Sequence, residues 1–250
     1  MPSRLVMRHG HTLKQCCSLT KPLVRESSSC VSNNGGRLSI LGASGPSGLE
    51  LVREALLQGY EVQALVRSPD KITLTDHKLT VERVNIFKTA DLANRLRGST
   101  AVLSCLGARA SLLSHQPCTL YSQSMKTIAA AMTAAGVHRF VCVDSWSTKY
   151  TPGSPKVIEW FSRPLFLGSV LSDMAAMEDY ARHHCSNINY TFVRAPGLSS
   201  GPSTGKRIKV TEGQYVKGVS LSMPRRDVVK FMLSAINTQE WDRKCVAIGI

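Results

Sequence analysis

Short apolar runs alternate with amphipathic segments along most of the chain, from Arg37 to the C-terminus. Residues 37–41 (RLSIL) have the length and composition of a buried strand, whereas residues 48–60 (GLELVREALLQGY) carry apolar side chains at helical spacing. The alternation continues to residues 244–250 (KCVAIGI), the last strand pattern. This order predicts an α/β fold with a mostly parallel sheet and helices on both faces.

The other elements follow from the same periodicities and from glycines that end helices, such as Gly59, Gly98 and Gly136. Pro224 is placed in the first turn of the last helix, where its missing N–H costs little. We expect strands at residues 37–41, 61–67, within 78–87, 101–107, 139–145, 189–197 and 244–250, and helices at residues 48–60, 90–98, 120–136, 171–184 and 224–237.

Residues 1–36 differ from the rest, because they are rich in basic residues and serine and contain Glu26 as their one acid. This composition is typical of a mitochondrial transit peptide, and an untargeted disordered extension is the alternative. We expect a cytoplasmic protein, with a mitochondrial location as the alternative if the segment is a targeting signal. No run of apolar residues reaches the ~20 that span a bilayer.

Charge and composition narrow the class of ligand. The 250-residue chain has a formal net charge of +14, but its longest basic run is two residues and only 6% of its residues are aromatic. These features weigh against nucleic acid and favour an anionic small molecule. The eight cysteines lack C-x-x-C spacing, and the histidine pairs lack further ligands, so we expect no metal site. The oligomeric state stays open.

Three glycines follow the first strand in the sequence GASGPSG, at positions 42, 45 and 48. In a Rossmann-type, doubly wound fold, the first glycine permits a tight turn, the second lets the backbone approach a pyrophosphate, and the third lets the helix pack on the strand. The phosphates then bind at the positive N-terminal end of that helix. The alternative is a turn whose glycines serve packing alone.

The second strand ends in Arg67 and Ser68, where an NAD-binding protein usually has an acidic residue for the ribose hydroxyls. A guanidinium cannot accept a hydrogen bond, but it suits the 2′-phosphate of NADP(H). We therefore expect NADP(H) as the cofactor. The alternative for Arg67 is a solvent-facing side chain at a strand end.

From Arg37 onward the chain resembles the atypical short-chain dehydrogenase/reductase superfamily, and within it the NAD(P)H-binding group that includes biliverdin reductase B, an NADPH-dependent flavin reductase. The glycine and arginine motifs are shared across the superfamily, and the later segments are more specific to the group. The resemblance rests on GASGPSG (42–48), ALVRS (64–68), LSCLGAR (103–109), VCVDS (141–145), DMAAMEDY (173–180), NYTFVRAPGL (189–198), GPSTGKRIKV (201–210) and SMPRRDVVKFML (222–233).

The resemblance implies roles for individual residues around NADP(H). The diphosphate would be held by the glycine turn, the 2′-phosphate by the end of the second strand, the adenine by the end of the third, and the nicotinamide side by the later loops. In this order the residues are Gly42, Ser44, Gly45, Pro46, Ser47 and Gly48; Arg67 and Ser68; Asn85; Leu106, Gly107, Arg109 and Pro196; and Ser145 beside the reacting ring. For Ser145, a strand-end serine that caps a loop is an equal alternative.

Two departures bear on the reaction. No tyrosine has a lysine four positions later, so the Y-x-x-x-K proton donor of ordinary short-chain dehydrogenases is missing. Gly197 stands where the biliverdin reductase B group has a histidine, and Asp144-Ser145 replaces its Thr-Ser. These changes favour hydride transfer to a flavin-like or quinone-like acceptor over a tetrapyrrole. A catalytically weak NADP(H)-binding sensor or scaffold is the alternative.

The acceptor side is expected in two segments. Trp146, Trp160 and Phe161 could roof a flat aromatic acceptor, although a small hydrophobic lobe is an equal alternative. Asp173 and Glu178 are interpreted as surface charges of a helix. We expect residues 1–36 to be an extension and residues 37–250 one NAD(P)-binding domain, with a small substrate lobe at about 146–172 and 197–222.

Overall fold

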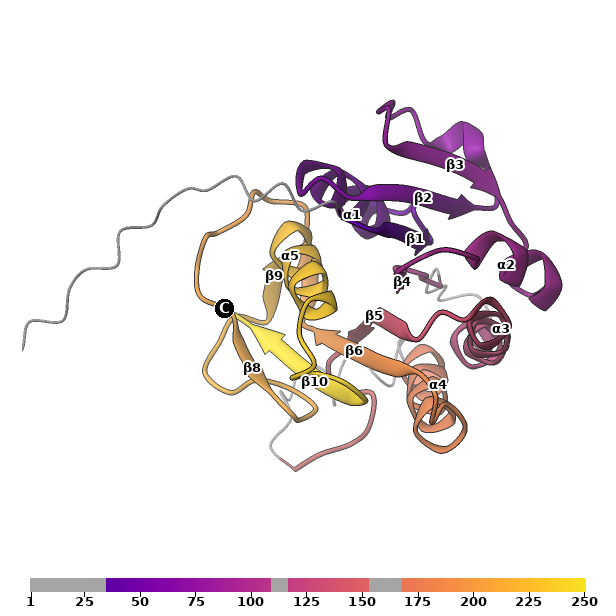
Figure 1. Ribbon diagram of the computed structural model, residues 1–250. Coiled ribbons are helices and arrows are strands. Elements are labelled where there is room, and N and C mark those ends of the chain that lie inside the picture. Colours follow the sequence, from indigo (N-terminus) through magenta and orange to yellow (C-terminus); the bar gives the residue numbers. More distant parts are fainter. Residues whose placement is uncertain (1–34, 109–116, 153–167) are drawn as a thin grey trace, which may run out of the picture. The chain divides into compact units, whose positions relative to one another are not determined.

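The computed structural model describes residues 35–108, 117–152 and 168–250, and the labels below follow Figure 1. Alternating strands and helices run through all three ranges. The strands are β1 (Arg37–Leu41), β2 (Glu61–Val66), β3 (Leu79–Arg83), β4 (Ala101–Ser104), β5 (Arg139–Ser145), β6 (Asn189–Ala195), β7 (Gly197–Ser199), β8 (Lys209–Thr211), β9 (Ser222–Pro224) and β10 (Lys244–Gly249). The helices are α1 (Pro46–Leu57), α2 (Thr89–Leu96), α3 (Leu120–Ala135), α4 (Gly168–His184) and α5 (Arg225–Ile236), with a short 3-10 helix η1 (Pro69–Lys71).

Eight of these strands form one sheet in the order β3-β2-β1-β4-β5-β6-β10-β8. All neighbours are parallel except β8, which pairs antiparallel with β10 at the edge. The chain moves outward from β1 to β3, returns to β4 on the other side of β1, and then proceeds outward again. This reversal is the arrangement of a doubly wound Rossmann-type fold, and it confirms the predicted fold class.

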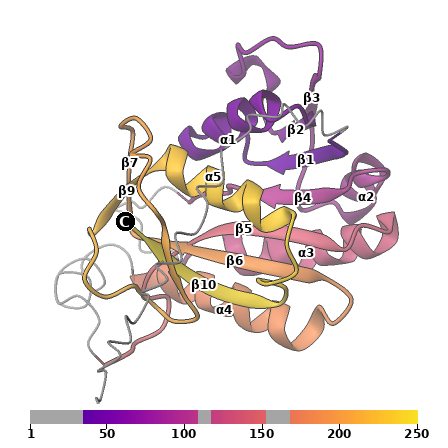
Figure 2. The same ribbon diagram turned by 60° about the vertical axis from the view of Figure 1, so that its left-hand side comes forward.

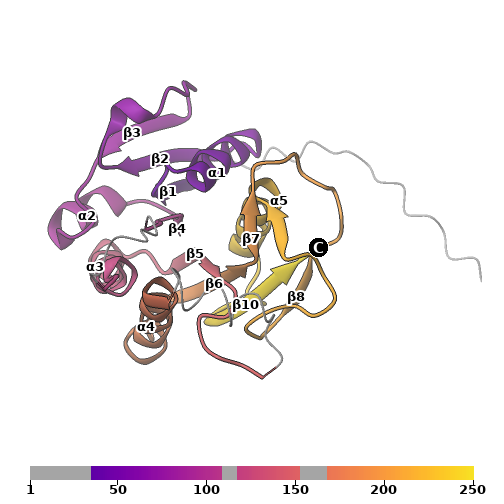
Figure 3. The same ribbon diagram turned by 180° about the vertical axis from the view of Figure 1, so that it is seen from behind.

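Helices cover both faces of the sheet. Helices α1 and α5 pack together on one face, and α2, α3 and α4 pack on the other (Figures 1 and 3). Ile40 of β1 belongs to the core beneath α1 and α5, while the next residue, Leu41, belongs to the core beneath α2, α3 and α4. Alternate strand residues therefore fill two separate cores, because successive side chains point to opposite faces.

The segment after β6 forms a second, smaller sheet. Strands β7 and β9 pair in parallel, with Leu198 opposite Met223, and they lie beside the start of α5 (Figure 2). The sequence did not predict this pairing. Pro224 ends β9 with an extended backbone (φ −58°, ψ 137°) and occupies the N-cap position of α5, so its expected place inside the first turn is wrong by one residue.

Asp173 on α4 is buried, with 6% of its surface exposed, so the interpretation as a surface charge is wrong. Its carboxylate accepts the backbone N–H groups of Tyr121 (2.7 Å) and Ser122 (3.2 Å), at the start of α3. No side chain at the N-cap position of α3 provides this bond. A carboxylate from a different helix therefore caps α3 and ties it to α4.

Candidate functional site

The predicted site residues follow the carboxyl edge of the sheet in strand order. Because the strands are parallel, the residues that come directly after them lie at one edge, and the strand order reverses between β1 and β4, which is where doubly wound folds bind their ligands. From β3 to β6, the predicted residues at this edge are Asn85, Arg67 with Ser68, the turn that begins at Gly42, Leu106 with Gly107, Ser145, and Pro196.

Gly42 occupies the point where the loops after β1 and β4 touch. Its φ angle is +72°, and a Cβ atom there would lie 2.7 Å from the carbonyl oxygen of Cys105. The backbone N–H of Cys105 donates to Leu41 O at 2.9 Å, which holds the two loops together. Both the conformation and the contact exclude a larger residue at position 42.

The other two glycines differ in what the chain requires of them. A Cβ atom on Gly48 would lie 2.2 Å from the carbonyl oxygen of Gly42, so α1 packs on the turn only with glycine there. Gly45 donates its N–H to the same oxygen at 3.0 Å, yet a Cβ atom on Gly45 would make only an ordinary 3.4 Å contact. The space beside Gly45 is therefore not filled by packing among the described residues.

The first turn of α1 is suited to an anion. Gly45 is the N-cap residue and has no side chain to cap the helix, and the first turn contains no acidic residue. Pro46 is at the first helical position, where its lack of an N–H is harmless. Half-buried Ser44 and Ser47 flank this turn. A diphosphate fits here, because backbone N–H groups and the helix dipole both favour negative charge.

At the end of β2, Arg67 is exposed and Ser68 is half-buried. Ser68 is the N-cap residue of η1, but its hydroxyl makes no capping bond. At the end of β3, the side-chain oxygen of Asn85 accepts the N–H of Phe87 at 3.0 Å. That turn orients the Asn85 amide at the sheet edge, two strands from the glycine turn.

On the other side of this reversal, after β4, Leu106 is half-buried and Gly107 is exposed. The N–H of Ala108 donates to the hydroxyl of Tyr121 at 2.9 Å, which anchors the loop after β4 to α3. Burial raises the pKa of Tyr121 to about 12, so this hydroxyl remains neutral. Arg109, Trp160 and Phe161 lie outside the described residues.

Ser145 and Pro196 are brought close by the pairing of β5 with β6. Ser145 is in register with Ala195, the residue before Pro196. Ser145 is half-buried, and its N–H donates to its neighbour Asp144 at 2.8 Å. The hydroxyl of Ser145 therefore lies at the strand ends that border the predicted nicotinamide side.

Behind Ser145 lies a buried ionic cluster that the sequence interpretation missed. Glu178 of α4 is fully buried, contrary to the expected surface charge, and receives two hydrogen bonds of 2.7 Å from Arg194 of β6. Asp144 is in register with Arg194 and only 4% exposed, and among the described residues its second carboxylate oxygen has no partner. Burial, and then the nearby Glu178 carboxylate, raise the pKa of Asp144 well above its ordinary value.

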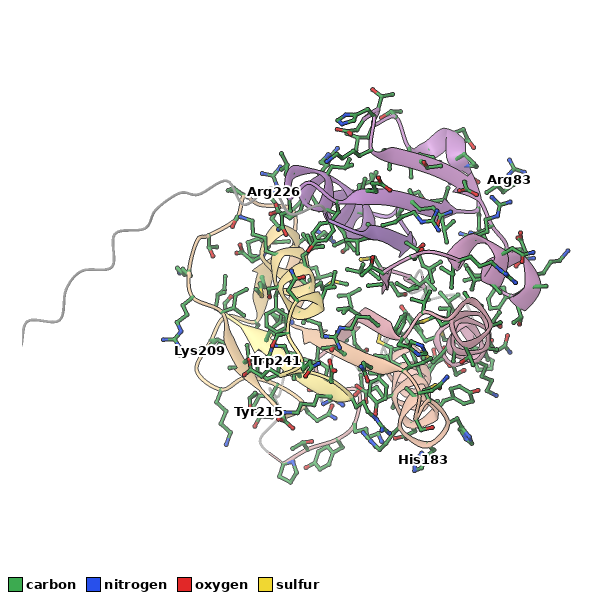
Figure 4. The ribbon with its side chains drawn as sticks, in the orientation of Figure 1. Arg83, His183, Lys209, Tyr215, Arg226 and Trp241 are labelled. Atoms are coloured by element: carbon green, nitrogen blue, oxygen red, sulfur yellow. The ribbon has the colours of Figure 1, made fainter. Side chains whose placement is uncertain are left out.

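Trp146 does not lie at an open surface. Its side chain is 2% exposed, its indole N–H donates to Ile248 O at 3.1 Å, and its ring meets edge-on the ring of Tyr215, which Figure 4 labels. The predicted roof over an acceptor needs an accessible ring face, and the structure places this ring in a small core with Val216 and Ala247 instead.

Curated relatives match most of this chain. A chloroplastic protein of Arabidopsis thaliana, At2g34460, is 26% identical over 217 residues, which are 85% of this chain and 76% of the relative. The photosystem II assembly factor Ycf39 of Synechocystis is 26% identical over 216 residues, which are 83% of this chain and 60% of the relative. In the part of this chain that the structure describes, no helix is long and apolar enough to cross a membrane.

Solved structures share the fold. A short-chain dehydrogenase/reductase of Veillonella parvula in complex with NADP has a TM-score of 0.66 and 18% identity, and covers 86% of this chain and 94% of its own. A candidate NADH-flavin reductase of Streptococcus pneumoniae has a TM-score of 0.67 and 22% identity, and the match covers 86% of this chain and 99% of that structure.

The sequence model of a family described as NAD(P)H-binding matches residues 42–239, which begin at the first glycine of the turn and run from α1 through β2–β6 and the small sheet to α5. The narrower resemblance to biliverdin reductase B stays a prediction. The fold, the glycine turn at the reversal of strand order and this match lead to one conclusion: the chain belongs to the NAD(P)H-binding family of Rossmann-fold proteins.

Proposed function

We propose that the protein is an NADPH-dependent oxidoreductase that transfers a hydride to a flavin-like or quinone-like aromatic acceptor. The observation that carries this proposal is the glycine turn, where the chain needs glycine at positions 42 and 48 and leaves space beside Gly45 at an uncapped helix N-terminus. This combination suits the diphosphate of a dinucleotide. The exposed Arg67 at the end of β2 supports NADP(H) over NAD(H).

Each loop at the carboxyl edge of the sheet would hold one part of the cofactor, which supplies the hydride when it is bound. The first turn of α1 binds the diphosphate, and Arg67 with Ser68 binds the 2′-phosphate. Leu106, Gly107 and Pro196 border the nicotinamide side, and Ser145 orients the acceptor through its hydroxyl. Holding two reactants in a reactive arrangement contributes about 7–11 kcal/mol to lowering a barrier, so positioning alone supports substantial catalysis.

The acceptor class follows from the missing proton donor. A ketone requires a proton as the hydride arrives, whereas a flavin or a quinone accepts a hydride and takes its proton from water. The chain has no Y-x-x-x-K pair, which fits the second class. Gly197 in place of a histidine makes a tetrapyrrole the less favoured acceptor.

A second candidate is an NADP(H)-binding protein with little turnover, which acts as a redox sensor or scaffold. The missing donor favours it, and so does the similarity to a relative named as a photosystem II assembly factor. Both candidates use the same cofactor site, and they differ in whether an acceptor oxidises the bound cofactor.

The decisive experiment offers the purified full chain NADPH together with FMN, a quinone or biliverdin, and follows the absorbance of the reduced nicotinamide. We expect turnover with FMN or the quinone and little with biliverdin. Saturable NADPH binding without oxidation by any acceptor would contradict the reductase proposal and support the second candidate.

Two serine variants test how the acceptor is oriented. Ser145→Ala is expected to lower kcat by about tenfold while leaving NADPH affinity nearly intact, since one hydrogen bond to the acceptor is lost. Ser186→Ala, in the exposed turn between α4 and β6, is the matched control and keeps the wild-type rate. An unchanged kcat in Ser145→Ala would show that the Ser145 hydroxyl does not orient the acceptor.

A further inference from the structure

A small pocket of about 150 Å³ lies between α1 and the segments that follow β7 and β9. One wall is a face of α1 with Pro46, Glu50 and Arg53. The opposite wall contains Ser200 after β7 and Arg225 with Arg226 at the start of α5, and Arg226 lies beside α1 in Figure 4. The pocket is therefore bounded by both the dinucleotide-binding helix and the small sheet.

The charges around this pocket do not balance. Arg53 donates to one oxygen of Glu50 at 3.0 Å, and Arg226 donates to the other at 2.9 Å. Both carboxylate oxygens thus already have a partner, while the third guanidinium, that of Arg225, is not paired with this acid. Three positive charges against one negative charge leave a net charge of +2 at the lining, which favours an anionic occupant.

Arg225 supplies a second, independent indication. One of its terminal nitrogens donates to the Ser200 hydroxyl at 3.0 Å, which orients the guanidinium. Its Nε is buried and has no partner among the described residues. A buried donor without an acceptor is costly, so the described residues leave the hydrogen bonding of the Arg225 guanidinium incomplete.

The size of the pocket limits what can enter. A water molecule needs about 10–15 Å³ of such volume, so 150 Å³ holds a group of several heavy atoms. Whole drug-sized ligands occupy about 300–1,000 Å³, which excludes an isoalloxazine ring or an adenosine. The pocket can take the charged end of a ligand whose larger part lies outside it.

Its position separates it from the proposed cofactor contacts. Pro46 lines the pocket and also begins α1, so the pocket adjoins the glycine turn. Arg67, proposed for the 2′-phosphate, is at the end of β2 and does not line it. The opposite wall follows β7, which begins directly after Pro196 on the proposed nicotinamide side. Both walls of the pocket therefore belong to segments of the chain that begin at the proposed cofactor site.

We propose that this pocket is a subsite for the phosphate monoester of the electron acceptor, read by Arg53, Arg225 and Arg226. The inference rests on the proposed reductase function and narrows its acceptor to a phosphorylated aromatic molecule of the flavin mononucleotide type. A doubly charged phosphate matches the net charge of the lining, and its several acceptor oxygens suit the fork geometry of arginine. Free inorganic phosphate has the same chemistry and is the other source of such an anion.

A comparison of FMN with riboflavin tests the phosphate subsite separately from hydride transfer, because the two flavins share the isoalloxazine ring and differ only by the phosphate. With NADPH in excess, we expect the KM for FMN to be about tenfold or more below that for riboflavin. Arg226→Ala and Arg53→Ala, both at half-exposed side chains, should bring the two KM values together. Arg225→Lys keeps the charge but loses the fork, and should remove part of the preference. Arg182→Ala on α4 is the matched control and retains the preference.

Calorimetry on the NADP⁺-loaded protein supplies a readout without turnover. FMN should bind more tightly than riboflavin, and millimolar inorganic phosphate should weaken FMN only. Equal affinities for FMN and riboflavin, unchanged in the arginine variants, would overturn the subsite. The reductase proposal would still stand in that case if riboflavin is reduced. Weakening of both flavins by phosphate would assign the pocket to a free anion and overturn the acceptor role. Arginine-dependent FMN binding without reduction of any acceptor would keep the subsite and overturn the reductase proposal.

Discussion

The guanidinium of Arg67 is exposed at the carboxyl end of β2, where NAD-binding proteins usually have a carboxylate. We predict that Arg67→Glu weakens NADPH by about 10–100-fold, since one or two charge-assisted hydrogen bonds to the 2′-phosphate are lost and a repulsion is added. NADH, which lacks this phosphate, should change little. Titration of both coenzymes into the variant measures the difference.

Arg182→Glu is the control for this charge reversal, because Arg182 is an exposed arginine in the last turn of α4 that pairs with Asp179. It should leave the ratio of NADPH to NADH affinity at the wild-type value. Equal losses of NADPH and NADH in Arg67→Glu would show that Arg67 does not read the 2′-phosphate.

Because the pKa of Asp144 is raised in the folded protein, we predict that the free energy of unfolding falls as the pH rises. Its raised pKa means that the folded protein keeps a proton that the unfolded chain releases above about pH 4. The stabilisation is complete below that pH and is lost as the pH rises through the folded-state pKa. Asp144→Asn cannot titrate, so its free energy of unfolding should decline less steeply with pH, by up to about 1.4 kcal/mol per pH unit in this window.

Urea unfolding of the wild type and Asp144→Asn at a series of pH values measures this slope. Asp179→Asn, at a half-exposed side chain of α4, is the matched control and should keep the wild-type slope. Parallel pH profiles for the wild type and Asp144→Asn would show that Asp144 is ionised in the folded protein.

At the residue scale, the sequence was most informative where one backbone requirement governs a position. Gly42 is predicted as a turn glycine, and its φ angle of +72° agrees. Gly48 is predicted as a packing glycine, and the 2.2 Å contact that a Cβ atom would make there agrees. Asp173 and Glu178 were misread, because their partners on α3 and β6 are distant along the chain. A polar residue on an amphipathic helix looks the same in the sequence whether it faces water or a buried arginine.

The turn before α1 is the element on which cofactor binding depends, and two substitutions separate its roles. In Gly45→Ala the new Cβ atom makes only a 3.4 Å contact, so we expect the melting temperature to stay near that of the wild type while NADPH binds at least tenfold more weakly. In Gly48→Ala the Cβ atom would lie 2.2 Å from Gly42 O, so stability itself should fall, by about 1–3 kcal/mol. Thermal melts with and without NADPH distinguish the two. Full NADPH affinity in Gly45→Ala would contradict a diphosphate at this turn.

The contact between α3 and α4 depends on Asp173, which caps α3 from outside. Asp173→Ala is expected to cost about 1–2 kcal/mol of unfolding free energy, because two N–H groups at the start of α3 lose their acceptor. Chemical denaturation measures the loss, and Asp179→Ala on the same helix is the control. A loss below 0.5 kcal/mol, within the range of ordinary surface substitutions, would contradict the capping role.

At the element scale, the seven parallel strands of the main sheet and the helices that cover it were predictable within a few residues, because buried parallel strands are short continuous apolar runs. The antiparallel edge strand β8 was not predicted. Strand β3 ends at Arg83, earlier than the apolar pattern through Phe87 suggests, since the chain turns at Asn85. The pairing of β7 with β9 was not predictable. Three-residue strands have too few positions for a periodicity, and tertiary contacts decide their partners.

At the scale of the whole molecule, the order of the strands places motifs that are distant in the sequence beside one another, at one edge of the sheet. The sequence predicted a parallel sheet, but the row of loops from Asn85 to Pro196 follows only from the observed order β3-β2-β1-β4-β5-β6. The assignment of individual residues to cofactor and acceptor, the small substrate lobe and the cellular location of the protein stay predictions. Residues 1–34 lie outside the described part of the chain.

Calorimetric titration of NADPH into the full, folded chain tests the central claim most directly. We predict saturable binding of one NADPH per chain, clearly tighter than NADH, and markedly weakened in Gly45→Ala. Circular dichroism of the same samples would show that the protein and the variant are folded. A folded wild-type protein that takes up neither NADPH nor NADP⁺ nor NADH would contradict the account.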